Sequence, residues 1–294
     1  MSRPIPVLQE PRPHLPPWFK IRLREGPGYR EIRRLTKELN LHTICEEARC
    51  PNVWECWNSR TATFLILGDI CTRRCHYCAV TTGRPHPLDE AEPERVAAAV
   101  KALGLRHAVL TSVNRDELPD GGARIFAETI RAVRRELPAC TVEVLIPDFL
   151  GDEAALETVL AAQPDILNHN IETVPRLFAS VRPQGRYPQS LALLQTASRR
   201  GAVTKSGLMV GLGETREEVL AVMRDLRGAG CSIVSIGQYL QPTTAHWPVT
   251  RFYSPEEFDL FKEEGRALGF RHVESGPLVR SSYHAEQQAS ADPA

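Results

Sequence analysis

The sequence predicts an α/β fold made of six consecutive βα units. From Thr63 onward, short apolar runs alternate with longer stretches of helical periodicity. Glycines or helix-capping residues separate the two kinds of segment. Strands that alternate with helices form a parallel sheet with the helices outside. We expect this sheet either to be open and doubly wound or to curl like a barrel, because both folds share the pattern.

Each predicted element has its own local signal. The strand candidates are residues 63–70, 107–113, 141–146, 165–171, 203–210 and 232–239. The helix candidates are residues 94–103, 123–137, 153–162, 189–200, 216–228 and 255–268, with an earlier helix at 29–39. Gly104, Gly201 and Gly230 lie just past helix ends, where a left-handed cap is usual. Ser254 and Pro255 predict the N-cap and first residue of the last helix.

Composition excludes several classes of protein. The 36 basic residues balance the 36 acidic ones, so net charge gives no argument for nucleic acid or an anionic membrane. No stretch approaches the roughly 20 apolar residues that span a bilayer. Residues 1–20 contain six prolines and lack the apolar segment of a secretory signal. We therefore expect a cytoplasmic enzyme.

Six of the eight cysteines lie between residues 45 and 78 and form two groups of three. The first group is Cys45, Cys50 and Cys56, spaced C-x4-C-x5-C, and the second is Cys71, Cys75 and Cys78, spaced C-x3-C-x2-C. Disulfides are disfavoured in a chain of this length without a signal. Structural zinc sites usually pair two C-x2-C motifs, which this chain lacks. Three thiolates leave one iron of a four-iron cluster open, so iron–sulfur is favoured over zinc.

Polar residues and glycines follow the predicted strand ends. Cys71 follows the first strand, residues 114–116 the second, and Glu172 the fourth. Residues 211–214 follow the fifth strand, and residues 238–241 close the sixth. The carboxyl ends of parallel strands meet on one face of a sheet or barrel. The sequence therefore predicts one active site on that face.

The second cysteine group, with Tyr77 before its last cysteine, resembles the signature of the radical S-adenosylmethionine superfamily. The resemblance implies that Cys71, Cys75 and Cys78 hold a four-iron, four-sulfur cluster. Its fourth iron would bind S-adenosylmethionine, whose cleavage yields a 5′-deoxyadenosyl radical. It also implies a partial (β/α)6 TIM-type barrel.

The same resemblance suggests contacts to S-adenosylmethionine. Tyr77 would pack near adenine, and Glu172 would hydrogen-bond a ribose hydroxyl. Gly211 and Glu214 belong to a glycine-rich segment that resembles the superfamily's adenine-binding stretch. An ordinary strand-to-helix turn explains that segment equally well, and a solvated loop carboxylate is the alternative for Glu172.

The two cysteine groups together resemble the lipoyl synthase family. Further agreement comes from T-S-V-N-R-D at 111–116, S-V-R-P at 180–183, K-S-G-L-M-V-G at 205–211, G-Q-Y-L-Q-P at 237–242 and V-R-S-S-Y-H-A at 279–285. The resemblance implies that Cys45, Cys50 and Cys56, with Ser282, hold an auxiliary 4Fe–4S cluster that donates sulfur. The implied reaction inserts sulfur at C6 and C8 of a protein-bound octanoyl-lysine. It assigns no catalytic residue beyond the cluster ligands.

The resemblance also implies an organisation and a set of partners. An N-terminal extension (1–60) and a C-terminal extension (271–294) would carry the auxiliary cluster on either side of the barrel (61–270). The partners would be an octanoylated lipoyl-carrier domain, a reductant such as ferredoxin or flavodoxin, and an iron–sulfur carrier that rebuilds the cluster. The carrier domain would come from a dehydrogenase-complex acyltransferase subunit or the glycine cleavage H protein. A biotin synthase-like sulfur inserter, a two-cluster electron carrier and a zinc-structured module are the alternatives.

Overall fold

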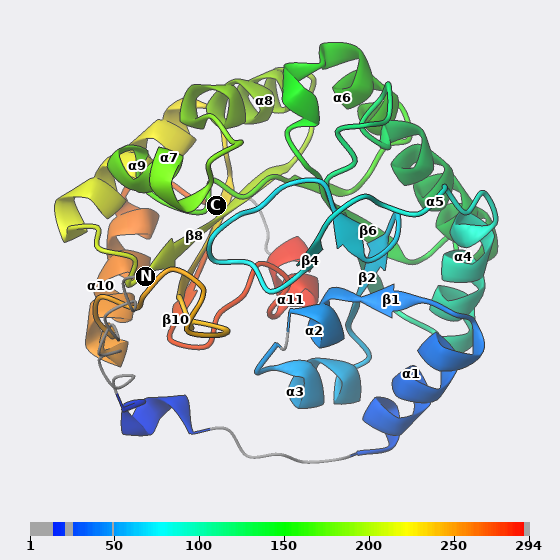
Figure 1. The fold of residues 1–294 in the computed structure, drawn as a ribbon, viewed down its shortest axis with the longest axis horizontal. Helices are drawn as coiled ribbons and strands as arrows, with labels where there is room; N and C mark the ends of the chain where they lie inside the picture. The colour runs from blue at the N-terminus through cyan, green and yellow to red at the C-terminus, as the bar shows by residue number, and fades with distance from the viewer. Residues whose placement is uncertain (1–13, 21–25, 49, 291–294) are drawn as a thin grey trace, which may run out of the picture.

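A single curled sheet of eight strands organises the chain (Figure 1). The computed structural model describes residues 14–20, 26–48 and 50–290. The strands follow the order β1 (His42–Thr43), β2 (Ala62–Ile66), β5 (His107–Ser112), β6 (Thr141–Leu145), β7 (Ile166–Asn168), β8 (Thr204–Val210), β9 (Ile233–Gln238) and β10 (His272–Gly276). All neighbours pair in parallel except β1, which runs antiparallel to β2.

The strand order decides between the two predicted arrangements. A doubly wound sheet reverses its strand order at a switch point. Here the parallel strands lie side by side in chain order from β2 to β10, with no reversal. The sheet curls but does not close, since β1 and β10 are its two edges. The helices surround its outer face, as Figure 1 shows, which confirms a partial barrel.

The main helices lie close to their predicted positions. They are α1 (Pro27–Glu38), α4 (Glu92–Leu103), α5 (Ala123–Glu136), α6 (Glu153–Leu160), α8 (Tyr187–Arg199), α9 (Arg216–Gly228) and α10 (Pro255–Ala267). Gly104, Gly201 and Gly230 have φ values of 57°, 86° and 83°, so the left-handed caps are confirmed. Ser254 forms the predicted N-cap, reinforced by a capping box with Glu257.

Several short elements were not predicted. They are η1 (Pro17–Phe19), α2 (Ile44–Glu47), α3 (Val53–Asn58), β3 (Ile70–Cys71), β4 (Thr81–Thr82), η2 (Phe149–Gly151), α7 (Pro175–Val181), α11 (Ala285–Ser290) and the seventh parallel strand, β10. The first predicted strand was also too long. It ends at Ile66, because Leu67 and Gly68 turn the chain with φ values of 69° and 89°. Cys71 therefore lies on the separate strand β3, which pairs with β4.

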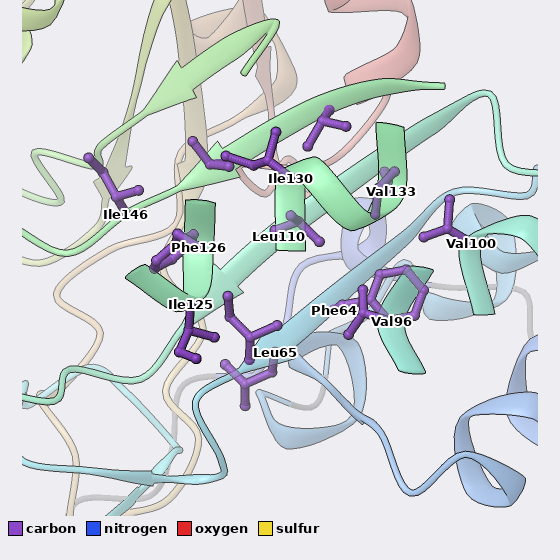
Figure 2. Close-up of a cluster of buried hydrophobic side chains, with 14 of the residues drawn as sticks. Phe64, Leu65, Val96, Val100, Leu110, Ile125, Phe126, Ile130, Val133 and Ile146 are labelled. Carbon is purple, nitrogen blue, oxygen red and sulfur yellow. The ribbon is translucent and has the colours of Figure 1, made fainter. Parts of the chain in front are cut away.

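The core fills the space between the sheet and its helices. Figure 2 shows one half of it, in which side chains of β2 and β5 face those of α4 and α5. Its labelled members are Phe64, Leu65, Val96, Val100, Leu110, Ile125, Phe126, Ile130, Val133 and Ile146. The two isolated cysteines, Cys140 and Cys231, are buried in the core as expected. Within the described residues, no helix combines the length and apolar character that a membrane crossing requires.

A buried ion pair lies inside the barrel. Lys205 Nζ on β8 lies 2.8 Å and 3.1 Å from the two carboxylate oxygens of Glu143 on β6. Asn168 Nδ2 donates a third hydrogen bond to Glu143, and His107 Nε2 lies 3.6 Å away. Burial opposes the charge of Glu143, but Lys205 and His107 outweigh it and hold its pKa at about 2. This pair therefore stabilises the fold at neutral pH, and its contribution is lost as pH falls from about 4 toward 2.

We expect Lys205→Met to destabilise the fold by about 3–5 kcal/mol, because it leaves Glu143 buried without its counter-charge. The double substitution Lys205→Met with Glu143→Gln removes both charges and should recover part of the loss. Urea unfolding of the cluster-free proteins at pH 7 compares the two. A single variant as stable as the double one would contradict this account.

Candidate functional site

A cavity of about 480 Å³ opens at the carboxyl ends of the parallel strands. Side chains from most strands of the sheet line it, as the sequence predicted for the active face. Cys71, Cys75 and Cys78 lie on its wall together with Tyr77 and Glu172. The structure thus brings the second cysteine group together with two of the four residues expected to contact S-adenosylmethionine.

Arg73 anchors the loop that carries these cysteines. Its guanidinium is fully buried. It donates two hydrogen bonds to Asp116, at 2.7 Å and 2.9 Å. It donates two more to Asp148, at 2.9 Å and 2.6 Å. Asp116 follows β5 and Asp148 follows β6, so one side chain fixes the loop to two strand ends. Burial opposes the charge of Asp148, but Arg73 holds its pKa at about 2. Bidentate pairs of this kind fix orientation as well as position.

Two histidines also hold the cysteine loop, through contacts with parts of the chain other than those that Arg73 binds. His76 donates through Nδ1 to the carbonyl of Ser180 at 2.6 Å. His246 donates through Nε2 to the carbonyl of Cys78 at 3.0 Å. The backbone N–H of Trp247 completes the contact by donating to the His76 carbonyl at 2.8 Å. The loop is therefore held by segments from four different parts of the barrel.

The surroundings of Cys71 suit a thiolate ligand. Its sulfur accepts from the backbone N–H of Arg73 at 3.4 Å and of Asn114 at 3.3 Å. The Asn114 side-chain amide lies 3.8 Å away as a third donor. N–H donors to cysteine sulfur are among the features that tune iron–sulfur clusters.

The other cysteines of this group are protonated as free thiols. Burial raises the pKa of Cys78 to about 12, and the neighbouring Cys75 and Cys71 add to the effect. Burial likewise raises the pKa of Cys75, against the pull of Arg182. Such thiols are poor nucleophiles, which argues against a cysteine-nucleophile enzyme. A bound cationic centre would reverse these shifts, because metal ligation deprotonates thiols.

Glu172 is held in a strained backbone conformation. Its φ is 70°, a value that non-glycine residues rarely adopt. Its backbone pairs with β8 on both sides, because Glu172 N–H donates to Gly207 and Met209 N–H donates to Glu172. Burial raises the pKa of its carboxyl group. Such strain clusters at functional sites, and here it fixes a carboxyl group on the cavity wall.

Gly211 and Glu214 shape the turn after β8, whereas Tyr77 and Glu172 line the cavity. The Glu214 carboxylate accepts from the N–H groups of Gly211 at 2.6 Å and Leu212 at 2.9 Å, closing its own turn. A Cβ on Gly211 would lie 2.0 Å from Gln238 Nε2, so the glycine is needed for close packing. Neither residue is among those that line the cavity. Their geometry is that of the strand-to-helix turn considered as the alternative.

The first cysteine group lies around a smaller pocket beside the large cavity. Cys45 from α2, Cys50 from the following turn and Cys56 from α3 line this pocket. Ser282, the residue that the resemblance implies as the fourth ligand, lines the same pocket from a distant part of the chain. Ser282 also lines the large cavity, so it forms part of the wall between the two sites.

The C-terminal residues 278–284, here called the closing segment, form one side of the small pocket. Asn52 Nδ2 donates to the Leu278 carbonyl at 2.6 Å. The Tyr283 hydroxyl lies 3.2 Å from both carboxylate oxygens of Glu55, and His284 lies 3.3 Å from one of them. These contacts tie the closing segment to α3. The open side of the sheet is thereby bridged next to the first cysteine group.

The four residues that the resemblance implies for the auxiliary cluster all line this small pocket. Burial raises the pKa of Cys45 to about 12, with Cys50 adding to the effect. Burial raises the pKa of Cys56 further, and both Cys45 and Cys50 add to that shift. The buried Trp57 indole N–H faces Cys45 and lacks a conventional hydrogen-bond partner among the described residues. A sulfur anion at this place would satisfy it.

Sequence reasoning missed the residues that hold the site together. In the sequence, Arg73 is distinguished only by its place between two cysteines. Its partner Asp148 lies 75 positions further along the chain. A position directly beyond a strand end was the one available signal for Asp116 and Asp148. That signal did locate residues 114–116, which include Asp116 and Asn114, the donor to Cys71. It missed Asp148.

Comparisons with known proteins agree with this geometry. Residues 65–226 match the radical S-adenosylmethionine superfamily, and residues 5–50 match the N-terminal domain of lipoyl synthase. The chain is 62% identical over 287 residues to the lipoyl synthase of Rubrobacter xylanophilus, covering 97% of this chain and 89% of the relative. It is 59% identical over 282 residues to that of a Roseiflexus species, covering 95% and 94%.

Solved structures share the fold at lower identity. Methylornithine synthase superimposes with a TM-score of 0.57 and 15% identity, covering 90% of this chain and 88% of that one. This likeness supports the partial barrel.

We expect Gly237→Ala to displace the closing segment, because a Cβ there would lie 2.1 Å from the Val279 carbonyl oxygen. Overpacking of this kind costs about 1–3 kcal/mol. Amide hydrogen exchange of residues 278–284 should become faster in this variant. Gly276→Ala is the milder comparison, since Gly276 pairs with Gly237 across β9 and β10 and its added Cβ would lie 3.3 Å from Val279 Cγ2, against 2.1 Å from the Val279 carbonyl oxygen in Gly237→Ala. Equal exchange in the two variants would contradict the steric argument.

Proposed function

The chain belongs to the lipoyl synthase family of the radical S-adenosylmethionine superfamily, and we propose how its two cysteine groups divide that family's reaction. The reaction inserts sulfur atoms at C6 and C8 of a protein-bound octanoyl-lysine to give a lipoyl group. It requires a 4Fe–4S cluster and S-adenosylmethionine. When bound, the clusters and S-adenosylmethionine supply the 5′-deoxyadenosyl radical and the sulfur, while the protein binds, orients and excludes water.

In our proposal, Cys71, Cys75 and Cys78 hold the radical-generating cluster, and Cys45, Cys50 and Cys56 with Ser282 hold the sulfur-donating one. The observation that carries this division is the position of Ser282, which lines both the large cavity and the small pocket. An acyl chain in the cavity would thus lie between the two cysteine groups. Such placement converts a collision between separate reactants into an intramolecular step.

The cavity wall has the chemistry that an octanoyl chain needs. Ile44, Leu65, Val109, Leu145 and Leu208 contribute apolar surface to it. Burial of each CH₂ group of the acyl chain would contribute about 0.8 kcal/mol to binding. The same apolar surface excludes water from the reacting carbons.

The adenosyl part of the site is assigned to the wall near the second cysteine group. Tyr77 and Glu172 line the cavity beside Cys75, and their pKa values are raised mainly by burial. We assign Tyr77 to adenine packing and Glu172 to a ribose hydroxyl. Gly211 and Glu214 would act indirectly, by shaping the turn after β8.

Ser282 is the proposed fourth ligand of the sulfur-donating cluster. A serine alkoxide is a hard ligand for iron in a thiolate cluster, so it is released more readily than a cysteine. Ser282 lies on the closing segment and is only partly buried, whereas Cys45 on α2 is buried. This contrast supports a releasable ligand at Ser282.

The partners follow from the substrate's chemistry. We propose that the acyl chain is presented by an octanoylated lipoyl-carrier domain, either from a dehydrogenase-complex acyltransferase subunit or as glycine cleavage H protein. Ferredoxin or flavodoxin would supply electrons, and an iron–sulfur carrier would rebuild the consumed cluster. The extensions at 1–60 and 271–294 would hold that cluster against the barrel of 61–270.

We expect Cys75→Ala to abolish cleavage of S-adenosylmethionine, because it removes one ligand of the radical-generating cluster. Release of 5′-deoxyadenosine under reducing, anaerobic conditions measures this cleavage. Cys140→Ala is the matched control, since Cys140 is buried in the core away from both groups, and it should retain cleavage. Cleavage by Cys75→Ala at the wild-type rate would refute the assignment.

Anaerobic turnover with an octanoyl-lysyl peptide tests the division of labour. We expect the wild-type protein to add two sulfur atoms, detected by mass analysis of the peptide. Cys50→Ala should still release 5′-deoxyadenosine but should add no sulfur, because it lacks only the sulfur-donating cluster. Loss of both activities in parallel would instead indicate one shared site.

A further inference from the structure

The large cavity has a polar floor beneath its apolar walls. Thr63, Glu143 and Ser235 line the cavity near the amino ends of β2, β6 and β9, far from its mouth. Asn168 on β7 lines the cavity as well and donates to Glu143 at 3.1 Å. All four side chains are buried. These four residues are here called the floor.

The register of the parallel strands places the floor below an apolar level. Thr63 pairs with Val109, and Val109 pairs with Glu143, so these residues share one level of the sheet. Two residues further along β2 and β6, Leu65 and Leu145 line the cavity about 7 Å closer to its mouth. An acyl chain that enters from the mouth therefore passes apolar side chains before it meets polar ones.

A hydrogen-bonded bar crosses the barrel interior at the floor. Lys205 on β8 donates to Glu143 on β6, and Asn168 on the intervening strand β7 donates to the same carboxylate. The side chains of Lys205 and Glu143 have no solvent exposure. A chain that went deeper would have to break this buried ion pair, which costs more than the burial of a few CH₂ groups gains.

Two atoms of the floor have unsatisfied hydrogen-bonding capacity. Ser235 Oγ and Asn168 Oδ1 are buried and lack a hydrogen-bond partner within the part of the chain that the structure describes. Covering such atoms with hydrocarbon is unfavourable, because the contact offers them no hydrogen bond. The walls therefore attract CH₂ groups, whereas the floor opposes their approach.

The floor also adjoins the first cysteine group. Thr63 lines the large cavity and also lines the small pocket, together with Cys45, Cys50 and Cys56. A chain end that reaches the floor near Thr63 is thus beside that group. In the proposed function this end carries C8, one of the two carbons that receive sulfur.

We propose that the floor sets the length of the acyl chain that the cavity accepts, and that it stops the methyl end of an octanoyl group beside the first cysteine group. Longer chains are rejected because they would press CH₂ groups against buried polar atoms. The inference rests on the proposed function, which places the acyl chain in this cavity. It adds specificity-determining residues that hold no cluster.

The test compares hexanoyl-, octanoyl- and decanoyl-lysyl peptides as ligands. Their binding to the reconstituted holoprotein is measured by calorimetry under anaerobic conditions without a reductant, so that no turnover occurs. In an apolar cavity without a floor, the two extra CH₂ groups of a decanoyl chain would tighten binding about 15-fold. We expect the wild-type protein to bind the octanoyl peptide more tightly than either of the other two.

Substitutions at Ser235 should change this preference in opposite directions. Ser235→Ala removes an unpartnered hydroxyl and should raise the decanoyl-to-octanoyl affinity ratio by at least about fivefold. Ser235→Leu raises the floor and should weaken octanoyl binding more than hexanoyl binding. Ser112→Ala is the matched control, because Ser112 Oγ is likewise unpartnered among the described residues but lies at the carboxyl end of β5. Its decanoyl-to-octanoyl ratio should equal that of the wild-type protein.

A wild-type affinity that rises about 15-fold from the octanoyl to the decanoyl peptide would overturn the proposal. The same decanoyl-to-octanoyl ratio in Ser235→Ala and Ser112→Ala would also overturn it. If the wild-type protein bound the octanoyl peptide no more tightly than an acetyl-lysyl peptide, the acyl cavity of the proposed function would itself be refuted. The two failures are therefore distinguishable.

Discussion

One buried guanidinium holds the active face together. Arg73 lies inside the cysteine loop and binds Asp116 and Asp148, which extend from two neighbouring strands. The loop has little regular structure of its own, since β3 and β4 are two residues each. Its shape is therefore set by the barrel, through these charged hydrogen bonds and the contacts of His76 and His246. The same strands position the cavity wall and the loop.

The two cysteine groups depend on different parts of the chain. The second group sits on strand ends and is fixed by buried charges. The first group is carried by α2 and α3 and is completed by the closing segment, whose contacts with Glu55 are exposed to solvent. Exposed pairs of this kind contribute about 0–1 kcal/mol each. The barrel therefore holds the second cysteine group firmly, while the pocket of the first group has one weakly held wall.

The sequence predicted the six strands and their helices because each is a continuous apolar or periodic segment. It missed β10, in which Val273 is the one buried residue. It did not distinguish a curled sheet from a doubly wound one, because strand order depends on where each helix returns the chain. The cysteine spacing located both groups, and the resemblance placed Ser282 beside the first. The pairing of Arg73 with Asp148 depends on a contact across 75 positions that no local pattern records.

The small pocket has walls from the two ends of the chain. Cys45 contributes near the beginning, and Ser282 contributes twelve residues before the end. During synthesis, Cys45, Cys50 and Cys56 leave the ribosome long before the closing segment exists. The pocket then stays open on one side until the closing segment has been synthesised. A chain that stops before the closing segment keeps its first cysteine group but cannot enclose it.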